Sequence, residues 1–85
     1  MKVKVLFFAA LREQLGTSAE ELELPAAIST VAALKSHLME RGGAYGKAFG
    51  EKALIRTAVN QDLVQPTARI KAGDEIAFFP PVTGG

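Results

Sequence analysis

The sequence predicts one α+β domain, in which a mixed sheet of about five strands packs on one main helix. Three observations lead to this prediction. The 85 residues suffice for a single small domain. A hydrophobic content of 48% is enough for that domain to form a core rather than stay disordered. Local patterns follow one another as strand, strand, helix, strand, short strand and strand, which is the order of a β-grasp fold.

The first two strands are predicted to form an antiparallel hairpin with an expanded connection. Residues 2–9 alternate at first between apolar and lysine side chains, which is typical of a strand. Residues 9–16 predict one or two helical turns, ended by Gly16 in a left-handed cap. Residues 20–24 alternate acids with leucines and predict a half-buried strand, which Pro25 closes because proline cannot continue the hydrogen-bond ladder.

One substantial helix follows, with Thr30 as its N-cap and Gly42–Gly43 as its end. Its apolar side chains recur at helical spacing, at Val31, Leu34 and Leu38. The glycine-rich residues 42–50 predict a loop with a single helical turn, because Tyr45 and Phe49 stand four residues apart.

The second half of the chain predicts three more strands and a tail. Residues 54–59 form a strand that points Ile55, Thr57 and Val59 inward if Arg56 is exposed, and residues 60–62 turn it into a short strand at 63–64. The last strand covers residues 75–79. The predicted organisation is therefore a β-grasp domain over residues 1–79 and a flexible tail over residues 80–85.

Composition excludes several classes of function. The chain has no cysteine and one histidine, which argues against disulfides, thiolate catalysis and most metal sites, so we expect no metal to be bound. Its net charge of +1 gives no electrostatic footprint for nucleic acid or an anionic membrane. No apolar run approaches the roughly 20 residues of a spanning helix. We expect a cytoplasmic protein, and a carrier or binding module rather than a complete enzyme.

Large apolar side chains stand on both faces of the predicted sheet. Phe7 and Phe8 are adjacent, as are Phe78 and Phe79, and neighbours in a strand point to opposite faces. The helix covers only one face, so the residues opposite it form an exposed apolar patch for a partner. The patch is predicted to contain Leu6, Phe8, Leu63 and Phe79. The alternative is that Tyr45 and Phe49 fold over this face.

The tail Pro80–Pro81–Val82–Thr83–Gly84–Gly85 is the second unusual feature. The two prolines favour an extended path, which gives six residues a reach of about 19 Å at roughly 3.1 Å per residue. Gly84 and Gly85 have no Cβ, so they fit a channel too narrow for other side chains. The tail is therefore predicted to present the carboxylate of Gly85 as the reactive group.

Three segments together resemble a known family. They are V-L-F-F-A-A-L-R-E at residues 5–13, V-N-Q at residues 59–61 and G-D-E-I-A-F-F-P-P-V-T-G-G at residues 73–85. The chain resembles, over nearly its whole length, the small sulfur-carrying subunits of molybdopterin synthase, the MoaD family. A bare Gly-Gly end is shared by all ubiquitin-like carriers, whereas the F-F-P-P-V-T-G-G end is specific to this family. Sulfur carriers of thiamine synthesis are similar more distantly.

The resemblance implies a ubiquitin-like β-grasp fold and a series of reactions at Gly85. An adenylating enzyme similar to the ubiquitin-activating enzymes uses Mg-ATP to activate the carboxylate, and a sulfur donor converts it to a thiocarboxylate. The sulfur then passes to cyclic pyranopterin monophosphate to form molybdopterin. No cofactor is bound by the chain itself, and the catalytic residues are expected in the large subunit.

The resemblance also assigns the partner surface. Phe8, Leu63 and Phe79 match positions that meet the large subunit and the adenylating enzyme in turn. Arg12 matches a basic position of the same opening motif and is included in the predicted interface; the alternative is that it forms an ordinary salt bridge on the helix surface. The expected assembly is a heterotetramer of two small and two large subunits. The alternatives are a ubiquitin-like modifier, a sulfur carrier of another pathway such as thiamine synthesis, and an interaction domain with an inert tail.

Overall fold

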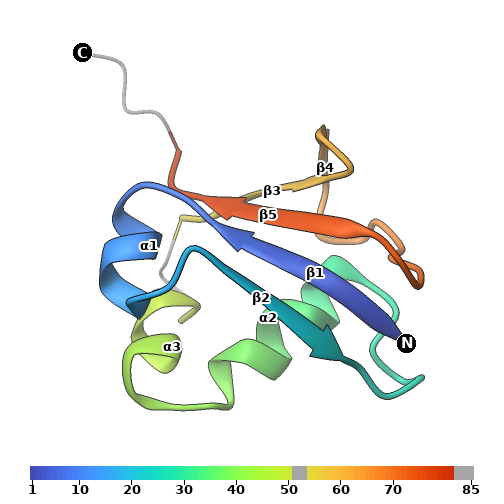
Figure 1. The fold of residues 1–85 in the computed structure, drawn as a ribbon, viewed down its shortest axis with the longest axis horizontal. Helices are drawn as coiled ribbons and strands as arrows, with labels where there is room; N and C mark the ends of the chain where they lie inside the picture. The colour runs from blue at the N-terminus through green and yellow to red at the C-terminus, as the bar shows by residue number, and fades with distance from the viewer. Residues whose placement is uncertain (51–53, 82–85) are drawn as a thin grey trace.

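The computed structural model describes residues 1–50 and 54–81, which form one mixed sheet and three helices (Figure 1). The strands are β1 (Lys2–Phe7), β2 (Ala19–Glu23), β3 (Arg56–Val59), β4 (Asp62–Val64) and β5 (Glu75–Phe79). The helices are α1 (Ala10–Leu15), α2 (Val31–Met39) and α3 (Gly43–Ala48). The strand order is β2-β1-β5-β3-β4, with β1 and β5 parallel and the other pairs antiparallel. The predicted succession of the five strands and the main helix along the chain and the expanded β1–β2 hairpin are confirmed.

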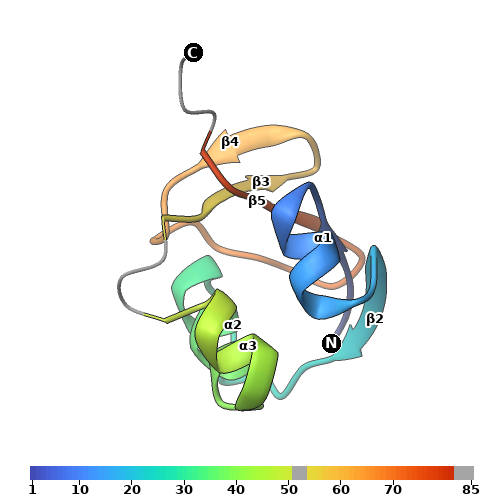
Figure 2. The same cartoon turned by 90° about the vertical axis from the view of Figure 1, so that its left-hand side faces the viewer.

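The prediction of one main helix was incomplete. Helix α2 is the longest of the described helices, but α1 and α3 also supply buried side chains, Leu11 and Ala48. Figure 2 shows α2 and α3 side by side on one side of the sheet, and Figure 1 shows α1 at one end of it. Helix packing therefore covers one face of the sheet along its length.

Helix α2 ends earlier than its glycine pair predicted. Thr30 caps its start as expected, because the Thr30 hydroxyl accepts a hydrogen bond from the Ala33 N–H at 3.1 Å. The last helical residue is Met39, after which the N–H groups of Arg41 and Gly42 bond three residues back and tighten the chain. Gly43 does not end α2; it is the first residue of α3.

Two strands are shorter than predicted. Strand β1 ends at Phe7 instead of Ala9, because Ala9 has a φ of 54° that cannot continue an extended strand. Strand β3 begins at Arg56 instead of Leu54. The turn after β3 has positive φ at Asn60 (51°) and Gln61 (73°), which is the pattern of a two-residue hairpin turn.

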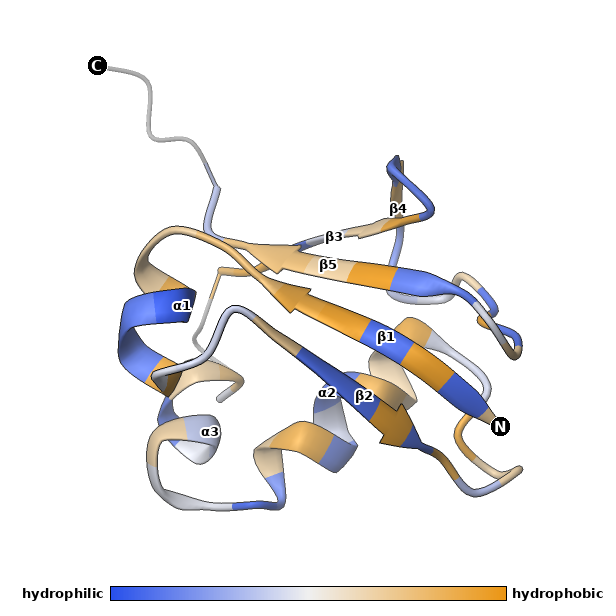
Figure 3. Ribbon diagram, in the orientation of Figure 1, coloured by the Kyte–Doolittle hydropathy of each residue, from blue (hydrophilic) through white to orange (hydrophobic). Residues whose placement is uncertain are grey.

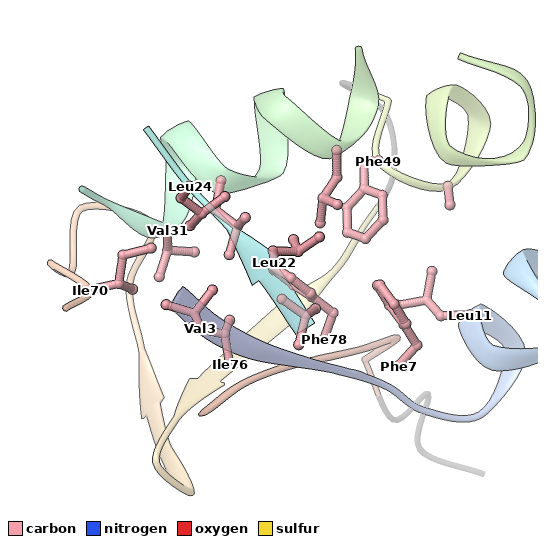
Figure 4. Packing of buried hydrophobic residues seen from close by; sticks show 14 residues of the cluster. Val3, Phe7, Leu11, Leu22, Leu24, Val31, Phe49, Ile70, Ile76 and Phe78 are labelled. Carbon is pink, nitrogen blue, oxygen red and sulfur yellow. The ribbon is translucent and has the colours of Figure 1, made fainter. Parts of the chain in front are cut away.

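The core lies between the sheet and the helices (Figure 4). Its centre is aromatic: the ring of Phe49 lies 5.1 Å from that of Phe78 and 6.2 Å from that of Phe7, in edge-on geometry. Tyr45 packs edge-on against Phe7 at 6.3 Å. Tyr45 and Phe49 thus pack against the helix-covered face, and the alternative that they shield the opposite face is wrong.

Candidate functional site

An apolar row crosses the face of the sheet that carries no helix. Residues directly opposite one another on paired strands share a face, so the strand register defines the row. Leu6 pairs with Ala19 on one side and Ala77 on the other, Ala77 pairs with Ala58, and Ala58 pairs with Leu63. Three of the five members are alanines. Because alanine side chains are short, the row protrudes little from the sheet and leaves space for side chains of another protein.

Two phenylalanines extend this row toward the C-terminal end of β5. The Phe8 N–H bonds to the Phe78 carbonyl at 3.1 Å, which continues the β1–β5 ladder one residue beyond β1. Phe79 pairs with Arg56 across β5 and β3. Phe8 is 46% exposed and Leu63 is 65% exposed, as predicted for these two members of the patch, whereas Leu6 and Phe79 are half-buried. The surface formed by the row together with Phe8 and Phe79 is called the apolar outer face below.

The other end of the same sheet face is charged. Lys2 lies 3.9 Å from Glu21, and the N-terminal ammonium lies 2.9 Å from Glu23 and lowers the pKa of that carboxyl by hydrogen bonding. Figure 3 shows this contrast as hydrophilic colour in much of β2 and at the N-terminal end of β1, and hydrophobic colour toward the C-terminal end of β1. A partner that avoids desolvating these charges is thus directed to the apolar end.

A tight turn sets the position of Phe8. The Leu11 N–H bonds to the Phe8 carbonyl at 3.2 Å, and Ala9 between them has φ 54° and ψ −130°. This conformation is unfavourable for a residue with a Cβ, so packing on both sides must maintain it. Buried Leu11 anchors the turn from below, while Arg12 is exposed on α1. The structure gives Arg12 no ion pair among the described residues, so its predicted interface role stays a prediction.

A hydrogen-bond network fixes the start of β5. Asp74 is 4% exposed and accepts bonds from the Asn60 side-chain amide at 3.0 Å and the Lys71 N–H at 2.9 Å. Asn60 in turn accepts a bond from the Glu75 N–H at 3.0 Å. The network ties the β3–β4 turn to β5. The network therefore helps to fix the position of β5, the strand that leads to Pro80 and Pro81.

Two prolines follow β5 at the edge of the apolar outer face. Pro80 and Pro81 are half-buried, and Pro81 lines a hollow together with Leu54, Ile55 and Arg56. The remaining predicted tail residues, Val82, Thr83, Gly84 and Gly85, lie outside the described residues.

The segment of residues 42–50 has a structural role. Arg41, just before it, makes a bidentate ion pair with Glu20 of β2, at 2.9 and 2.7 Å, and its guanidinium lies 4.8 Å from the centre of the Tyr45 ring. The hydrogen bond from Arg41 lowers the pKa of Glu20. These contacts hold α3 under the sheet, where Phe49 completes the core.

Sequence reasoning missed two residues of the site. Leu54 is 78% exposed, more than any other large apolar side chain described, and Arg56 is exposed opposite Phe79. The signal was the alternation of Leu54, Arg56 and Ala58 against inward-facing Thr57.

The part of the chain that the structure describes, residues 1–50 and 54–81, contains neither a cluster of metal ligands nor a membrane-spanning helix. No cluster of three or more His, Asp or Glu side chains in this part of the chain could hold a metal ion. The described helices are all too short to cross a membrane.

The fold and the site define a β-grasp domain of the ubiquitin-like class, with an apolar outer face next to its C-terminal end. The chain belongs to the ThiS family, whose model matches residues 5–85. Curated relatives from Haemophilus influenzae and Escherichia coli, each named molybdopterin synthase sulfur carrier subunit, are 46% identical over 83 residues, which cover 98% of this chain and 99% of each relative.

Solved structures agree with this assignment. A putative molybdopterin converting factor, subunit 1, from Pyrococcus furiosus is 33% identical with a TM-score of 0.79, covering 96% of this chain and 99% of that one. SAMP1 from Haloferax volcanii is 27% identical with a TM-score of 0.79, and each chain is fully covered. One chain in a solved complex of subunits 1 and 2 of molybdopterin-converting factor from Helicobacter pylori shares the fold, with 23% identity, full coverage of this chain and of that one, and a TM-score of 0.69.

Proposed function

We propose that this chain is the sulfur carrier subunit of molybdopterin synthase. The observation that carries the proposal is the 46% identity, over nearly the full length of both chains, to two relatives that bear this name. The apolar outer face supports it, because a carrier must be recognised by the proteins that load and unload it. A low, exposed apolar surface beside the C-terminal tail suits such recognition.

The reactive group in this proposal is the carboxylate of Gly85. A carboxylate oxygen attacks the α-phosphate of Mg-ATP, bound by an adenylating enzyme, and pyrophosphate leaves. A sulfur donor at the oxidation level of sulfide then attacks the acyl carbon as hydrosulfide; the carbon–sulfur bond forms, the bond from the acyl carbon to the adenylate oxygen breaks, and AMP leaves with that oxygen. This sequence replaces one carboxylate oxygen by sulfur. It needs no cysteine or metal on the carrier, because the sulfur is held by the end of the main chain.

The proposed partners share one docking surface. The large subunit of the synthase and the adenylating enzyme would each bind the apolar outer face, at Phe8, Leu63 and Phe79, while the tail enters their active sites. Binding is then mutually exclusive, which lets the carrier move from loading to delivery. Two small and two large subunits would form the complete synthase, and cyclic pyranopterin monophosphate would receive the sulfur.

A second candidate is a ubiquitin-like protein modifier, favoured by the 27% identity to SAMP1, a small archaeal modifier protein. A carrier of another pathway, such as thiamine synthesis, uses the same activation and differs only in the acceptor. Both alternatives require Gly85. They differ from the main proposal in the product formed after activation: an isopeptide bond to a lysine, or a thiocarboxylate with a different consumer.

Intact mass spectrometry after incubation with the adenylating enzyme, Mg-ATP and a sulfur donor tests the proposal. The full chain is expected to become heavier by the difference between a sulfur and an oxygen atom. The loaded chain, mixed with the large subunit and cyclic pyranopterin monophosphate, is expected to yield molybdopterin. A chain lacking Gly85 is the matched control and should do neither. Molybdopterin formation by that shortened chain would refute the mechanism, and isopeptide-linked products without sulfur loading would favour the modifier.

A further inference from the structure

The connection between β1 and α1 departs from two local conformational preferences at one residue, Ala9 (Figure 1). The Leu11 N–H bonds to the Phe8 carbonyl at 3.2 Å, so residues 8–11 form a β-turn with Ala9 at its second position. With φ 54° and ψ −130°, Ala9 has the conformation of a type II′ turn, in which glycine is the favoured residue at this position. A residue that carries a Cβ is strained there.

Ala9 is also the N-cap of α1. Its side chain forms no capping hydrogen bond. Glycine is preferred to alanine at an N-cap, as it is at a positive φ. The left-handed C-cap of the same helix, Gly16 with φ 73°, follows the preference from which Ala9 departs. By both criteria the methyl group of Ala9 is unfavourable for the free fold.

This methyl group lies at the surface of the molecule. Ala9 is exposed, and so is its neighbour Phe8 on the apolar outer face. Consecutive Cα atoms are about 3.8 Å apart, so a protein that covers the Phe8 ring also reaches Ala9. Positions at which a sequence departs from local preferences are typical of functional sites. The benefit of the methyl group is therefore expected outside the free domain.

We infer that Ala9 is a contact residue of the docking surface, and that its methyl group packs against the large subunit when that subunit binds Phe8. The inference rests on the proposed function for the identity of the partner. The strained turn exchanges stability of the free chain for affinity in the complex. An apolar, closely packed part of the partner's surface fits this group, because a methyl group offers neither a charge nor a hydrogen bond.

The variant Ala9→Gly tests the inference, because stability and affinity should change in opposite directions. Its thermal unfolding midpoint, followed by circular dichroism, is expected to rise by about 4 °C as the strain is removed. Its dissociation constant for the purified large subunit is expected to rise about fourfold, because one buried methyl contact is lost. Isothermal titration calorimetry with the full chain measures this constant.

The matched control is Gln61→Gly. Gln61 is likewise exposed, with a φ of 73°, but it lies in the β3–β4 turn. The neighbouring Asn60 N–H bonds to the carbonyl of Glu75, the first residue of β5, whereas the Phe8 N–H bonds to Phe78 near the other end of that strand. This variant should therefore bind the large subunit as tightly as the unaltered chain does.

A synthetic chain with D-alanine at position 9 separates contact from rigidity of the turn. D-alanine favours a positive φ, restricts the backbone more than glycine and directs its methyl group differently from L-alanine. This chain should be at least as stable as Ala9→Gly and should bind the large subunit as weakly. An affinity equal to that of the unaltered chain would overturn the inference, because rigidity of the turn would then account for binding.

Two further results would also overturn it. A stabilised Ala9→Gly with unchanged affinity would show that the partner does not contact the methyl group. A less stable Ala9→Gly would show that the methyl group serves the fold itself. Failure of the unaltered chain to bind the large subunit contradicts the proposed function instead.

Discussion

The two faces of the sheet both carry phenylalanine, at adjacent positions in the chain, but the side chains on one face are buried and those on the other are not. Phe7 and Phe78 are 1% and 0% exposed under the helices, whereas their neighbour Phe8 is 46% exposed on the opposite face. Burial of either kind of side chain removes a similar apolar area from water. On the inner face that free energy is gained during folding. On the outer face it remains available for binding, at the cost of an exposed apolar surface.

The inner face should show the largest effect on stability. Phe78→Ala is expected to lower the free energy of unfolding by about 3–5 kcal/mol, because it leaves a cavity among Phe7 and Phe49. Urea denaturation followed by circular dichroism measures the change. Phe79→Ala is the matched control, with an expected loss below about 1 kcal/mol. An equal loss of unfolding free energy in the two variants would contradict the assignment of Phe78 to the core and of Phe79 to the outer face.

The outer face should show the reverse pattern. Phe79→Asp is expected to weaken binding to the large subunit by at least about 30-fold, or roughly 2 kcal/mol, while the free domain stays folded. Isothermal titration calorimetry measures the affinity, and urea denaturation verifies the fold. The free domain should not unfold, because this side chain is not part of the buried cluster. Loss of the fold would instead place Phe79 in the core.

The smallest expected effect lies at the edge of the inner face, where Glu20 and Arg41 hold α3 in place. Glu20→Gln is expected to lower the free energy of unfolding at neutral pH by about 0.5–1 kcal/mol, because it removes a bidentate ion pair. The effect also depends on pH. Arg41 lowers the folded-state pKa of Glu20 below its ordinary value of 4.5.

The sign of that pH dependence follows from linkage. A carboxyl with a lowered pKa stabilises the fold fully above its unfolded-state pKa, and the contribution is lost as the pH falls from about 4.5 through the lowered value. The unaltered chain should therefore lose stability more steeply below pH 4.5 than Glu20→Gln does. Denaturation series at several pH values measure this. Parallel curves for the two proteins would show that the ion pair contributes nothing.

Much of the fold was predictable because its signals are local. Residues 75–79 were predicted as the last strand with the observed bounds, and the Thr30 cap and the Gly16 left-handed cap are both present. The ends of α2 and β1 were predicted wrongly. In each case a backbone conformation that depends on the next element, the start of α3 or the turn at Ala9, decides where the element stops.

The candidate site was predictable in part for the same reason. The alternation of side chains along the strands placed Phe8 and Phe79 opposite the helix-covered face. The F-F-P-P-V-T-G-G motif at residues 78–85 indicated the family. Arg56 and Lys35 were not predicted to line one hollow, because they come from β3 and α2, which are brought near each other only by the tertiary fold. No periodicity in one segment reports on a contact with another.

The amino-acid sequence by itself determined the apolar side chains on both faces of the strands and the cap residues Gly16 and Thr30. It also determined the composition of the tail and the absence of cysteine from the chain. The tertiary structure decided which face stayed uncovered, because Tyr45 and Phe49 could have packed against either one. It also aligned Leu6, Ala77, Ala58 and Leu63 into one row. The physical reason is that strand register and helix packing are set by the free energy of the whole core, to which residues far apart in the chain contribute together.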